Sequence, residues 1–384
     1  MMIGFDAKRA AQNKTGLGNY SRFVIEALTR FAPNERYLLY IPNPNRTSSL
    51  NGIEKANNVE LRYPQTTFWK KFRSLWRVWG ITSDIEKENI RLFHGLSNEL
   101  PLNIRKAENT RSIVTIHDLI FLRYPEYYHY IDRKIYAYKF RKACQNADRI
   151  IAVSECTKRD IIRYFNIPDD KIEVVYQGCD ISFTHPVTEE KKKEVRKKYQ
   201  LPDHYILNVG SIEERKNILA AVQALPMLPQ HIHIVIVGRR TGYTEKVEQF
   251  IKDNGLGERV HIISNVPFND LPAFYQLAEI FVYPSRFEGF GIPIIEALYS
   301  GIPVVAATGS CLEEAGGPDS IYVNPDDITG LADAFKQIYS NSDKRKNMVE
   351  KGREFAKRFS EKQQSEEIIN IYETLIRYAY FNNP

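Results

Sequence analysis

Residues 280–298 read Ile280-Phe-Val-Tyr-Pro-Ser-Arg-Phe-Glu-Gly-Phe-Gly-Ile-Pro-Ile-Ile-Glu-Ala-Leu298. The apolar run at 280–283 is typical of a buried strand, and the glycines that follow predict a turn. Pro293 suits the first turn of a helix, and the apolar residues after it give that helix a buried face. A strand, a glycine turn and a helix N-terminus in this order form a site for an anion such as phosphate.

Two carboxylates, Glu288 and Glu296, bracket the turn. Carboxylates repel phosphate, so we expect them to accept hydrogen bonds from the hydroxyls of a sugar or ribose beside it. A phosphate flanked by hydroxyl acceptors describes a nucleotide sugar.

The same alternation of short apolar strands and helices runs through the rest of the 384-residue chain, which is too long for one ordinary core. It predicts an α/β fold of two Rossmann-like, doubly wound domains that face each other across a cleft. We expect the first domain at 1–182, the second at 187–364, and a C-terminal helix at about 365–384 that packs back on the first. The expected strands are 2–5, 37–41, 90–93, 112–116, 149–153 and 172–175, then 205–209, 233–237, 260–262, 280–283 and 303–306.

The composition is that of a soluble globular protein, with 43% hydrophobic and 26% charged residues. No apolar run approaches the ~20 residues needed to span a bilayer, and no signal peptide opens the sequence, so we expect a cytoplasmic protein. The four cysteines, Cys144, Cys156, Cys179 and Cys311, are scattered and are expected to be free thiols.

Positive charge gathers in the first half of the chain. Residues 1–182 hold 29 Lys and Arg against 20 Asp and Glu, a balance of +9, and the remainder holds 24 against 27. A basic half of this kind is suited to binding nucleic acid, an anionic membrane surface or an acidic glycan. The alternative is that these charges form an ordinary solvated surface.

Residues 68–79 form one candidate contact with a membrane. At helical spacing their aromatic and apolar side chains share a face opposite Lys70, Arg73 and Arg77. That face could lie on an anionic bilayer at the inner side of the membrane, or pack on the sheet. Outside this stretch there is no aromatic and basic pattern of the kind that binds nucleic acid.

Three residues of the first half follow expected strands, where ligands bind in open parallel sheets. Gly16 and Gly18 follow the first strand, and either allow a ligand close to the backbone or form a plain tight turn. The motif lacks the third glycine of a dinucleotide site. His117 ends the strand at 112–116 and is either a ligand contact or a structural histidine.

In the second half, Asn208-Val-Gly-Ser-Ile-Glu-Glu-Arg-Lys-Asn217 follows an expected strand. Arg215 and Lys216 would stand where a diphosphate binds. A departing diphosphate gains negative charge, and fixed cations lower the barrier to its departure. The alternative is a surface turn.

Taken together, these residues resemble the retaining, GT-B-fold glycosyltransferases of family GT4, also called glycosyl transferases group 1. The similarity covers nearly the whole chain, and the combination of motifs in this order is more specific than any one motif alone. The matching motifs are Gly16-x-Gly18, Thr115-Ile-His117-Asp118, Ala152-Val-Ser154, Gly210 to Asn217, Glu288-x7-Glu296 and Ser310-Cys-Leu-Glu313.

The resemblance implies a role for each residue. Gly16 and Gly18 would lie near the donor phosphate and the acceptor, His117 would touch the transferred sugar, and Lys216 would neutralise the diphosphate. Glu288 would hold sugar hydroxyls, and Glu296 the ribose. Phosphate would be bound beside Gly210 and Ser211 by the backbone of Phe290, Gly291 and Ile292. The resemblance implies no metal, since Arg215 and Lys216 take its place, and no cofactor besides the donor.

One departure from the family pattern bears on the donor. Many members carry Arg directly after the glycine at Gly210, where this chain has Ser211, and Arg215 would supply the missing charge. The Arg-Lys-Asn variant resembles mannosyltransferase-like members that build bacterial surface polysaccharides. It favours GDP-mannose, with UDP-glucose, UDP-galactose and UDP-N-acetylglucosamine open, and a glycan or lipid-linked glycan as acceptor.

Two other functions fit parts of the pattern. An epimerase or hydrolase of similar fold would act on the nucleotide sugar without an acceptor. A non-enzymatic module would use the basic half to bind a membrane or nucleic acid.

Overall fold

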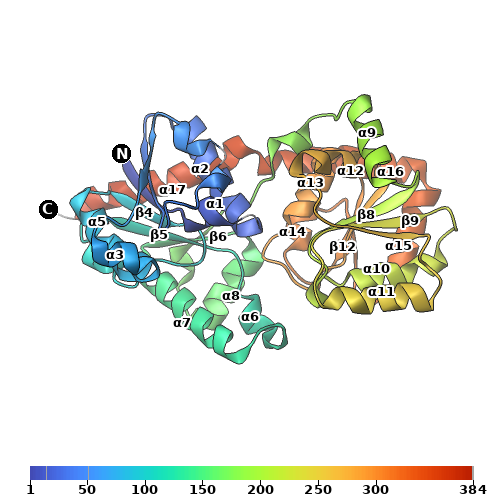
Figure 1. Ribbon diagram of the computed structural model, residues 1–384, viewed down its shortest axis with the longest axis horizontal. Helices are drawn as coiled ribbons and strands as arrows, with labels where there is room; N and C mark the ends of the chain where they lie inside the picture. The colour runs from blue at the N-terminus through green and yellow to red at the C-terminus, as the bar shows by residue number, and fades with distance from the viewer. Residues whose placement is uncertain (14, 51, 383–384) are drawn as a thin grey trace. The chain divides into compact units, whose positions relative to one another are not determined.

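The computed structural model describes residues 1–13, 15–50 and 52–382, which form two compact units (Figure 1). Unit 1 consists of Met1–Gln177 and Glu361–Pro384, and unit 2 of Gly178–Ser360. Each unit has its own parallel sheet with helices on both faces, as the alternation in the sequence predicts.

Unit 1 contains seven parallel strands in the order β3-β2-β1-β4-β5-β6-β7. The switch in strand order falls between β1 and β4, which pair with Ile3 opposite Leu92. The bounds are β1 (Met2–Asp6), β2 (Arg36–Tyr40), β3 (Val59–Arg62), β4 (Leu92–Gly95), β5 (Arg111–Ile116), β6 (Arg149–Ala152) and β7 (Ile172–Val174).

Successive residues of these strands point into two different cores. Leu39 and Ile113 pack beneath α1, α2 and α17, whereas Leu38 and Val114 pack beneath α5, α7 and α8. The helices of unit 1 are α1 (Lys8–Gln12), α2 (Gly16–Phe31), α3 (Thr67–Lys71), α4 (Arg73–Leu75), a π-helical turn (Trp76–Gly80), α5 (Ile81–Lys87), α6 (Ile120–Arg123), α7 (Tyr130–Asn146), α8 (Glu155–Phe165) and α17 (Glu361–Asn382).

Helix α17 follows unit 2 in the chain but packs in unit 1, against α2 (Figure 1). Its Ile368, Tyr372 and Leu375 are buried in the core of that unit. The expected helix at about 365–384 therefore begins four residues earlier, at Glu361, and residues 383 and 384 lie outside the described residues.

Unit 2 has six parallel strands in the order β10-β9-β8-β11-β12-β13, with the switch between β8 and β11. The strands are β8 (Tyr205–Val209), β9 (His233–Val237), β10 (Val260–Ile263), β11 (Ile280–Tyr283), β12 (Val304–Ala307) and β13 (Ile321–Val323). The helices are α9 (Glu189–Tyr199), α10 (Ile218–Ala224), α11 (Tyr243–Asp253), α12 (Leu271–Leu277), α13 (Ile292–Ser300), α14 (Leu312–Gly316), α15 (Ile328–Ser340) and α16 (Ser342–Ala356).

Residues 68–79 are not the single amphipathic helix that the spacing predicts. The segment breaks into α3, α4 and the π-helical turn, and Trp76 is fully buried while Trp79 is 46% exposed. The indole N–H of Trp76 donates to Asp84, at 2.7 Å. Within the part of the chain that the structure describes, no helix combines the length and the apolar character needed to cross a bilayer.

Candidate active site

The cationic and acidic residues predicted in unit 2 meet where β8 and β11 end. Lys216 lies in the loop after β8, and Glu288 in the turn after β11. These strands are neighbours at the switch in strand order, so their carboxyl ends open into the crevice where ligands bind in such sheets.

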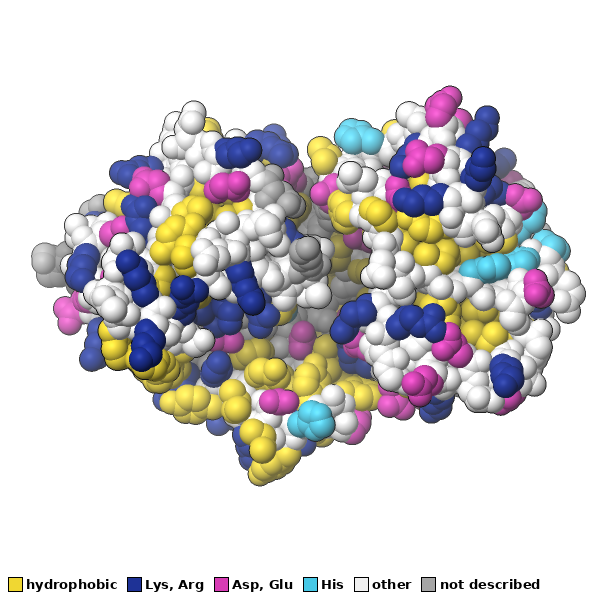
Figure 2. Space-filling model, in the orientation of Figure 1, with side chains coloured by type: hydrophobic (Ala, Val, Ile, Leu, Met, Phe, Trp, Pro, Cys, Tyr) yellow, Lys and Arg dark blue, Asp and Glu magenta, His cyan; other side chains and the backbone are white. Residues whose placement is uncertain are grey.

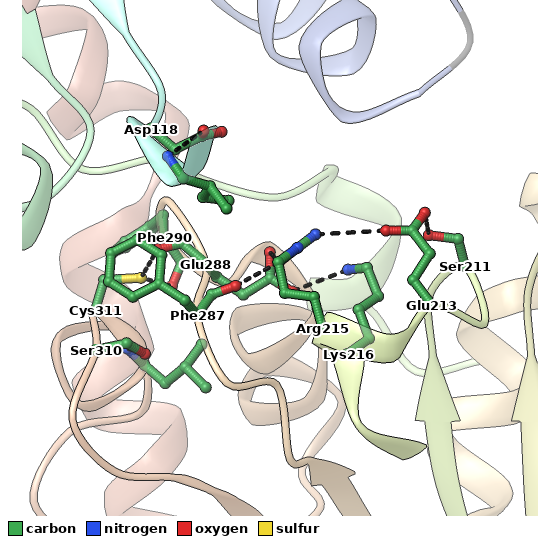
Figure 3. Close-up of polar contacts among 12 residues, drawn as sticks. Asp118, Ser211, Glu213, Arg215, Lys216, Phe287, Glu288, Phe290, Ser310 and Cys311 are labelled. Carbon is green, nitrogen blue, oxygen red and sulfur yellow. Dashed lines mark hydrogen bonds and ion pairs between the residues drawn. The ribbon is translucent and has the colours of Figure 1, made fainter. Parts of the chain in front are cut away.

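Glu288 holds two cations at once (Figure 3). One carboxylate oxygen lies 3.0 Å from Lys216 Nζ, and the other lies 2.8 Å from an Arg215 guanidinium nitrogen. Arg215 also donates to the backbone carbonyl of Phe287. All three charged side chains are at least four-fifths buried, so water screens their attraction only weakly.

Tyr283, the last residue of β11, completes this cluster. Its hydroxyl accepts a hydrogen bond from Lys216 Nζ at 2.9 Å and donates one to Glu288 at 3.1 Å. Burial and the Glu288 charge together raise the pKa of Tyr283 to about 12, so the hydroxyl keeps its proton. Tyr283 was not among the predicted site residues, although its place at the end of a buried strand is a usable signal.

The cluster holds all its charges at neutral pH. Burial acts to raise the pKa of Glu288, but Lys216 and Arg215 outweigh it and lower the pKa to about 2. Burial likewise acts to lower the pKa of Lys216, and Glu288 outweighs it and raises that pKa. Within the cluster of Arg215, Lys216 and Glu288, two cations against one carboxylate leave a net positive charge, and Glu213 beside Arg215 is itself paired with Arg239 at 3.6 Å.

The turn after Glu288 requires glycine at position 291. Gly291 has φ +129°, and a Cβ there would lie 3.1 Å from Leu312 and 3.4 Å from Ala315. From this residue α13 begins at Ile292, with Pro293 in its first turn as predicted. The N-terminal N–H groups of a helix have no partners within it, and they point where an anion would bind.

Cys311 stabilises this turn through two contacts of its thiol. Its thiol lies 3.0 Å from the carbonyl oxygen of Glu288 and 2.9 Å from that of Phe290. Phe290 is itself buried and packs edge-on against Phe359. None of the four cysteines forms a disulfide, as the sequence predicts.

Glu296 lies further along α13 and outside the ionic cluster. It accepts a hydrogen bond of 2.6 Å from the Tyr275 hydroxyl. Burial raises the pKa of Glu296 to about 7, with a further contribution from Asp180 that the Tyr275 hydrogen bond opposes. Its two carboxylate oxygens therefore change from a neutral to an ionised acceptor near neutral pH.

The two residues that open the loop after β8 differ in their contacts. Gly210 lies against Lys216, since a Cβ there would come within 3.3 Å of the lysine side chain. Ser211 donates a hydrogen bond of 2.5 Å to Glu213, which also lies 3.7 Å from Arg215. Arg215 is thus the residue that brings the second positive charge to Glu288.

In unit 1, His117 is buried at the end of β5 with both ring nitrogens bonded to protein. Nε2 donates to the carbonyl of Leu96 at 2.9 Å, and Nδ1 accepts from the Gln177 amide at 3.0 Å. Its backbone N–H donates to Asn98, at 2.7 Å. Burial lowers the pKa of His117 to about 4, so the imidazole is neutral.

A chain of buried polar groups runs from α17 to His117. Tyr372 Oη lies 2.6 Å from His94 Nδ1, and His94 Nε2 lies 2.8 Å from Thr115 Oγ1. The Thr115 hydroxyl lies 3.3 Å from that of Tyr20, whose ring packs edge-on against His117 at 4.6 Å. His94 therefore belongs to the support of His117.

Gly16 and Gly18, the two glycines predicted near a ligand, lie in the first turn of α2 and not in a loop before it. A Cβ on Gly18 would come within 1.9 Å of the Asn13 carbonyl oxygen, so this glycine is required by the chain's own packing. Gly16 has open space at the same point. Of the pair, Gly16 alone is free to accept a ligand close to its Cα.

No three His, Cys, Asp or Glu side chains are grouped to hold a metal ion anywhere in 1–13, 15–50 or 52–382.

The chain matches two sequence profiles of known families. The profile described as "Glycosyl transferases group 1" matches residues 187–355, and that described as "Glycosyltransferase Family 4" matches residues 23–183.

Two curated relatives carry related names. The chain is 32% identical to O-antigen chain mannosyltransferase B of Escherichia coli over 98% of this chain and 100% of that protein. It is 30% identical to O-antigen chain mannosyltransferase RfbU of Salmonella typhimurium, over 59% of this chain and 60% of that protein.

Solved structures share the fold at low identity. Sucrose-phosphate synthase from Thermosynechococcus elongatus superposes with a TM-score of 0.80 at 21% identity, over 98% of this chain and 100% of that chain. Anabaena Alr3699/HepE, solved in complex with UDP and glucose, gives 0.76 at 17% identity, over 97% and 99%. With 32% identity across almost the whole of a curated relative, the chain belongs to the GT4 family of GT-B glycosyltransferases, the glycosyl transferases group 1.

Proposed function

We propose that this glycosyltransferase moves a mannosyl group from GDP-mannose to a glycan or lipid-linked glycan acceptor in the synthesis of a bacterial surface polysaccharide. The observation that carries the proposal is the buried cluster of Arg215, Lys216 and Glu288 at the switch in strand order of unit 2. Mannose is favoured because relatives along the chain bear mannosyltransferase names.

Arg215 and Lys216 bind the diphosphate in this proposal. As the bond between the sugar C1 and the phosphate oxygen breaks, that oxygen gains negative charge, which the two cations stabilise. They take the place of a divalent metal. Glu288 accepts hydrogen bonds from sugar hydroxyls near C1, and Glu296 from the ribose hydroxyls.

The anomeric configuration is retained because the acceptor hydroxyl attacks C1 on the face that the diphosphate leaves. The proton of that hydroxyl passes to the departing phosphate oxygen. His117, which is neutral, contacts the sugar from unit 1, and Gly16 lies near the donor phosphate and the acceptor.

Turnover of GDP-mannose by Lys216→Ala and Glu288→Ala tests the proposal, with Lys336→Ala as a control because Lys336 is exposed and its ion pair is with Asp333, three residues earlier in the same helix. We expect both site variants to fall by about 100- to 1000-fold. Near wild-type rates in both would reject the assignment. GDP release that is unchanged when acceptor is omitted would favour a hydrolase or epimerase.

We place the protein in the cytoplasm, at the inner face of the membrane. A lipid-linked acceptor is held there, and the charge of +9 on residues 1–182 is attracted to anionic headgroups. We propose that this basic half contacts lipid and not nucleic acid.

A further inference from the structure

The outward face of α7 in unit 1 is apolar where a helix surface is normally polar. Ile131 is 70% exposed, Ile135 46% and Tyr138 56%, and their i, i+4, i+7 spacing places them in one stripe. The opposite side of the helix enters the core through Phe140 and its neighbours. Tyr130, at the start of the helix, is 65% exposed.

Positive charge flanks this stripe. Helix α7 contains Arg133, Lys134, Lys139, Arg141 and Lys142 against a single acid, Asp132. Lys134 Nζ lies over the Tyr130 ring at 5.3 Å from its centre. Among the described residues, neither Lys134 nor Lys142 has a carboxylate within ion-pair distance. We call Tyr130, Ile131, Lys134, Ile135, Tyr138 and Lys142 the α7 surface.

A second group of exposed aromatic residues lies on the same side of the unit 1 sheet. Trp76 belongs to the segment 67–80, and it shares one core with Phe140 of α7. Both segments therefore cover the same face of the sheet. Glu99 links them, at 2.8 Å from Arg77 and 3.6 Å from Lys139. Of the 14 large hydrophobic residues counted as exposed in the described chain, nine lie on these two segments. Figure 2 shows hydrophobic and basic side chains together at this edge of unit 1.

We infer that the α7 surface docks onto an anionic lipid bilayer. Tyrosine and aliphatic side chains with flanking lysines suit the boundary between headgroups and acyl chains, where the lysines meet lipid phosphates. A second copy of the chain would bring Lys134 and Lys142 of one α7 surface against the same lysines of the other, which disfavours self-association through this face. This inference rests on the proposed function in one respect, namely that the acceptor is linked to a lipid.

The position of α7 relates this membrane contact to the proposed acceptor site. The helix begins after β5, whose carboxyl end carries His117, so its exposed first turns lie at the same edge of the sheet as that histidine. A bilayer bound there would place lipid headgroups next to the edge of unit 1 at which an acceptor carried on a lipid would bind.

Co-sedimentation of the full chain with vesicles tests the inference. We expect binding to phosphatidylglycerol–phosphatidylcholine vesicles, weaker binding at high salt, and little binding to phosphatidylcholine alone. Ile131→Asn with Ile135→Asn should weaken binding at least tenfold, and Lys134→Gln with Lys142→Gln should weaken it in a salt-dependent way. Ile181→Asn with Met227→Asn is the matched control, because these residues are 56% and 45% exposed in unit 2.

Three results would overturn the inference: wild-type binding by the Ile131/Ile135 variant, a dimer that this variant dissociates, or preference for a single-stranded oligonucleotide over vesicles. The rise in melting temperature with GDP is measured in the same variants, and we expect it to be unchanged. Absence of that rise in the wild-type protein would count against the guanine donor and leave the lipid contact standing.

Discussion

Glu288 divides its carboxylate oxygens between Arg215 and Lys216, which makes it a competitor of any phosphate that approaches these cations. We therefore predict opposite effects of Glu288→Gln on binding and on turnover. GDP should bind several-fold more tightly, because both cations are released, while mannosyl transfer falls by about 100-fold or more. Calorimetric titration and an initial-rate assay measure the two quantities. Weaker GDP binding by Glu288→Gln would contradict the proposed competition.

The raised pKa of Glu296 predicts that stability and GDP affinity both depend on pH. Burial raises its pKa from 4.5 to about 7, so this group favours the folded state below pH 4.5, and that contribution is lost as pH rises to 7. Above pH 7 the ionised carboxylate is the better acceptor of ribose hydroxyls. GDP affinity should therefore rise between pH 6 and 8, more than that of 2′,3′-dideoxy-GDP, which lacks those hydroxyls. Equal pH profiles for the two ligands, or for wild type and Glu296→Gln, would exclude this role.

At this scale the sequence identifies the charged residues but not all their partners. Lys216, Glu288 and Glu296 stand out because each follows a recognisable strand or glycine turn. Tyr283 is marked by its place at the end of a buried strand, but its contact with Lys216 depends on the pairing of β8 with β11, which are separated by 70 residues, and local periodicity does not contain that pairing. The same limit applies to Gln177 at His117.

Among the elements, α17 shows most clearly how a helix supports a site at a distance. Its Tyr372 hydroxyl begins the buried chain through His94, Thr115 and Tyr20 to His117. We expect removal of that hydroxyl to leave the ring packing intact and to take from the His94 ring one of its two hydrogen bonds, the one at Nδ1. The element is thus predicted to matter for turnover as well as for stability.

Tyr372→Phe should lower the free energy of unfolding by about 1 kcal/mol and lower kcat several-fold, with little change in the KM for donor. Tyr37→Phe is the matched control, because Tyr37 is equally buried in unit 1 and donates to the carbonyls of Leu28 on α2 and of Ala32, which follows that helix. It should lose comparable stability and keep its kcat. Equal losses of kcat in both variants would assign Tyr372 a structural role alone.

Strands and helices with strong hydrophobic periodicity lie where the sequence predicts them, whereas segments whose packing overrides local periodicity do not. The strand at 280–283 is β11 as expected, since a continuous apolar run is buried on both faces. The edge strands β3 and β13 were missed because they are short and only partly buried. Residues 68–79 were wrongly predicted as one helix, because Trp76 turns into the core.

For the whole molecule, the division of the chain predicts different fates for two fragments. Residues 178–360 are continuous and contain the core and the charged cluster of unit 2. Expressed alone, this fragment should unfold cooperatively and bind GDP. Residues 1–177 alone lack Ile368, Tyr372 and Leu375, so part of their core stays open and they should not fold stably. Circular dichroism melts check both fragments, and 1–177 fused to 361–382 should recover a cooperative transition.

The return of α17 to unit 1 also sets an order of events during protein synthesis. A ribosome that has finished the strands of unit 1 still has about 200 residues to add before Ile368, Tyr372 and Leu375 emerge. At typical elongation rates this takes on the order of 10–40 s. Unit 2 becomes complete in that interval, so the later unit in the chain closes its core before the earlier one. Until α17 is synthesised, the part of the unit 1 core that α17 covers stays exposed to solvent, and this apolar surface must be kept from aggregating.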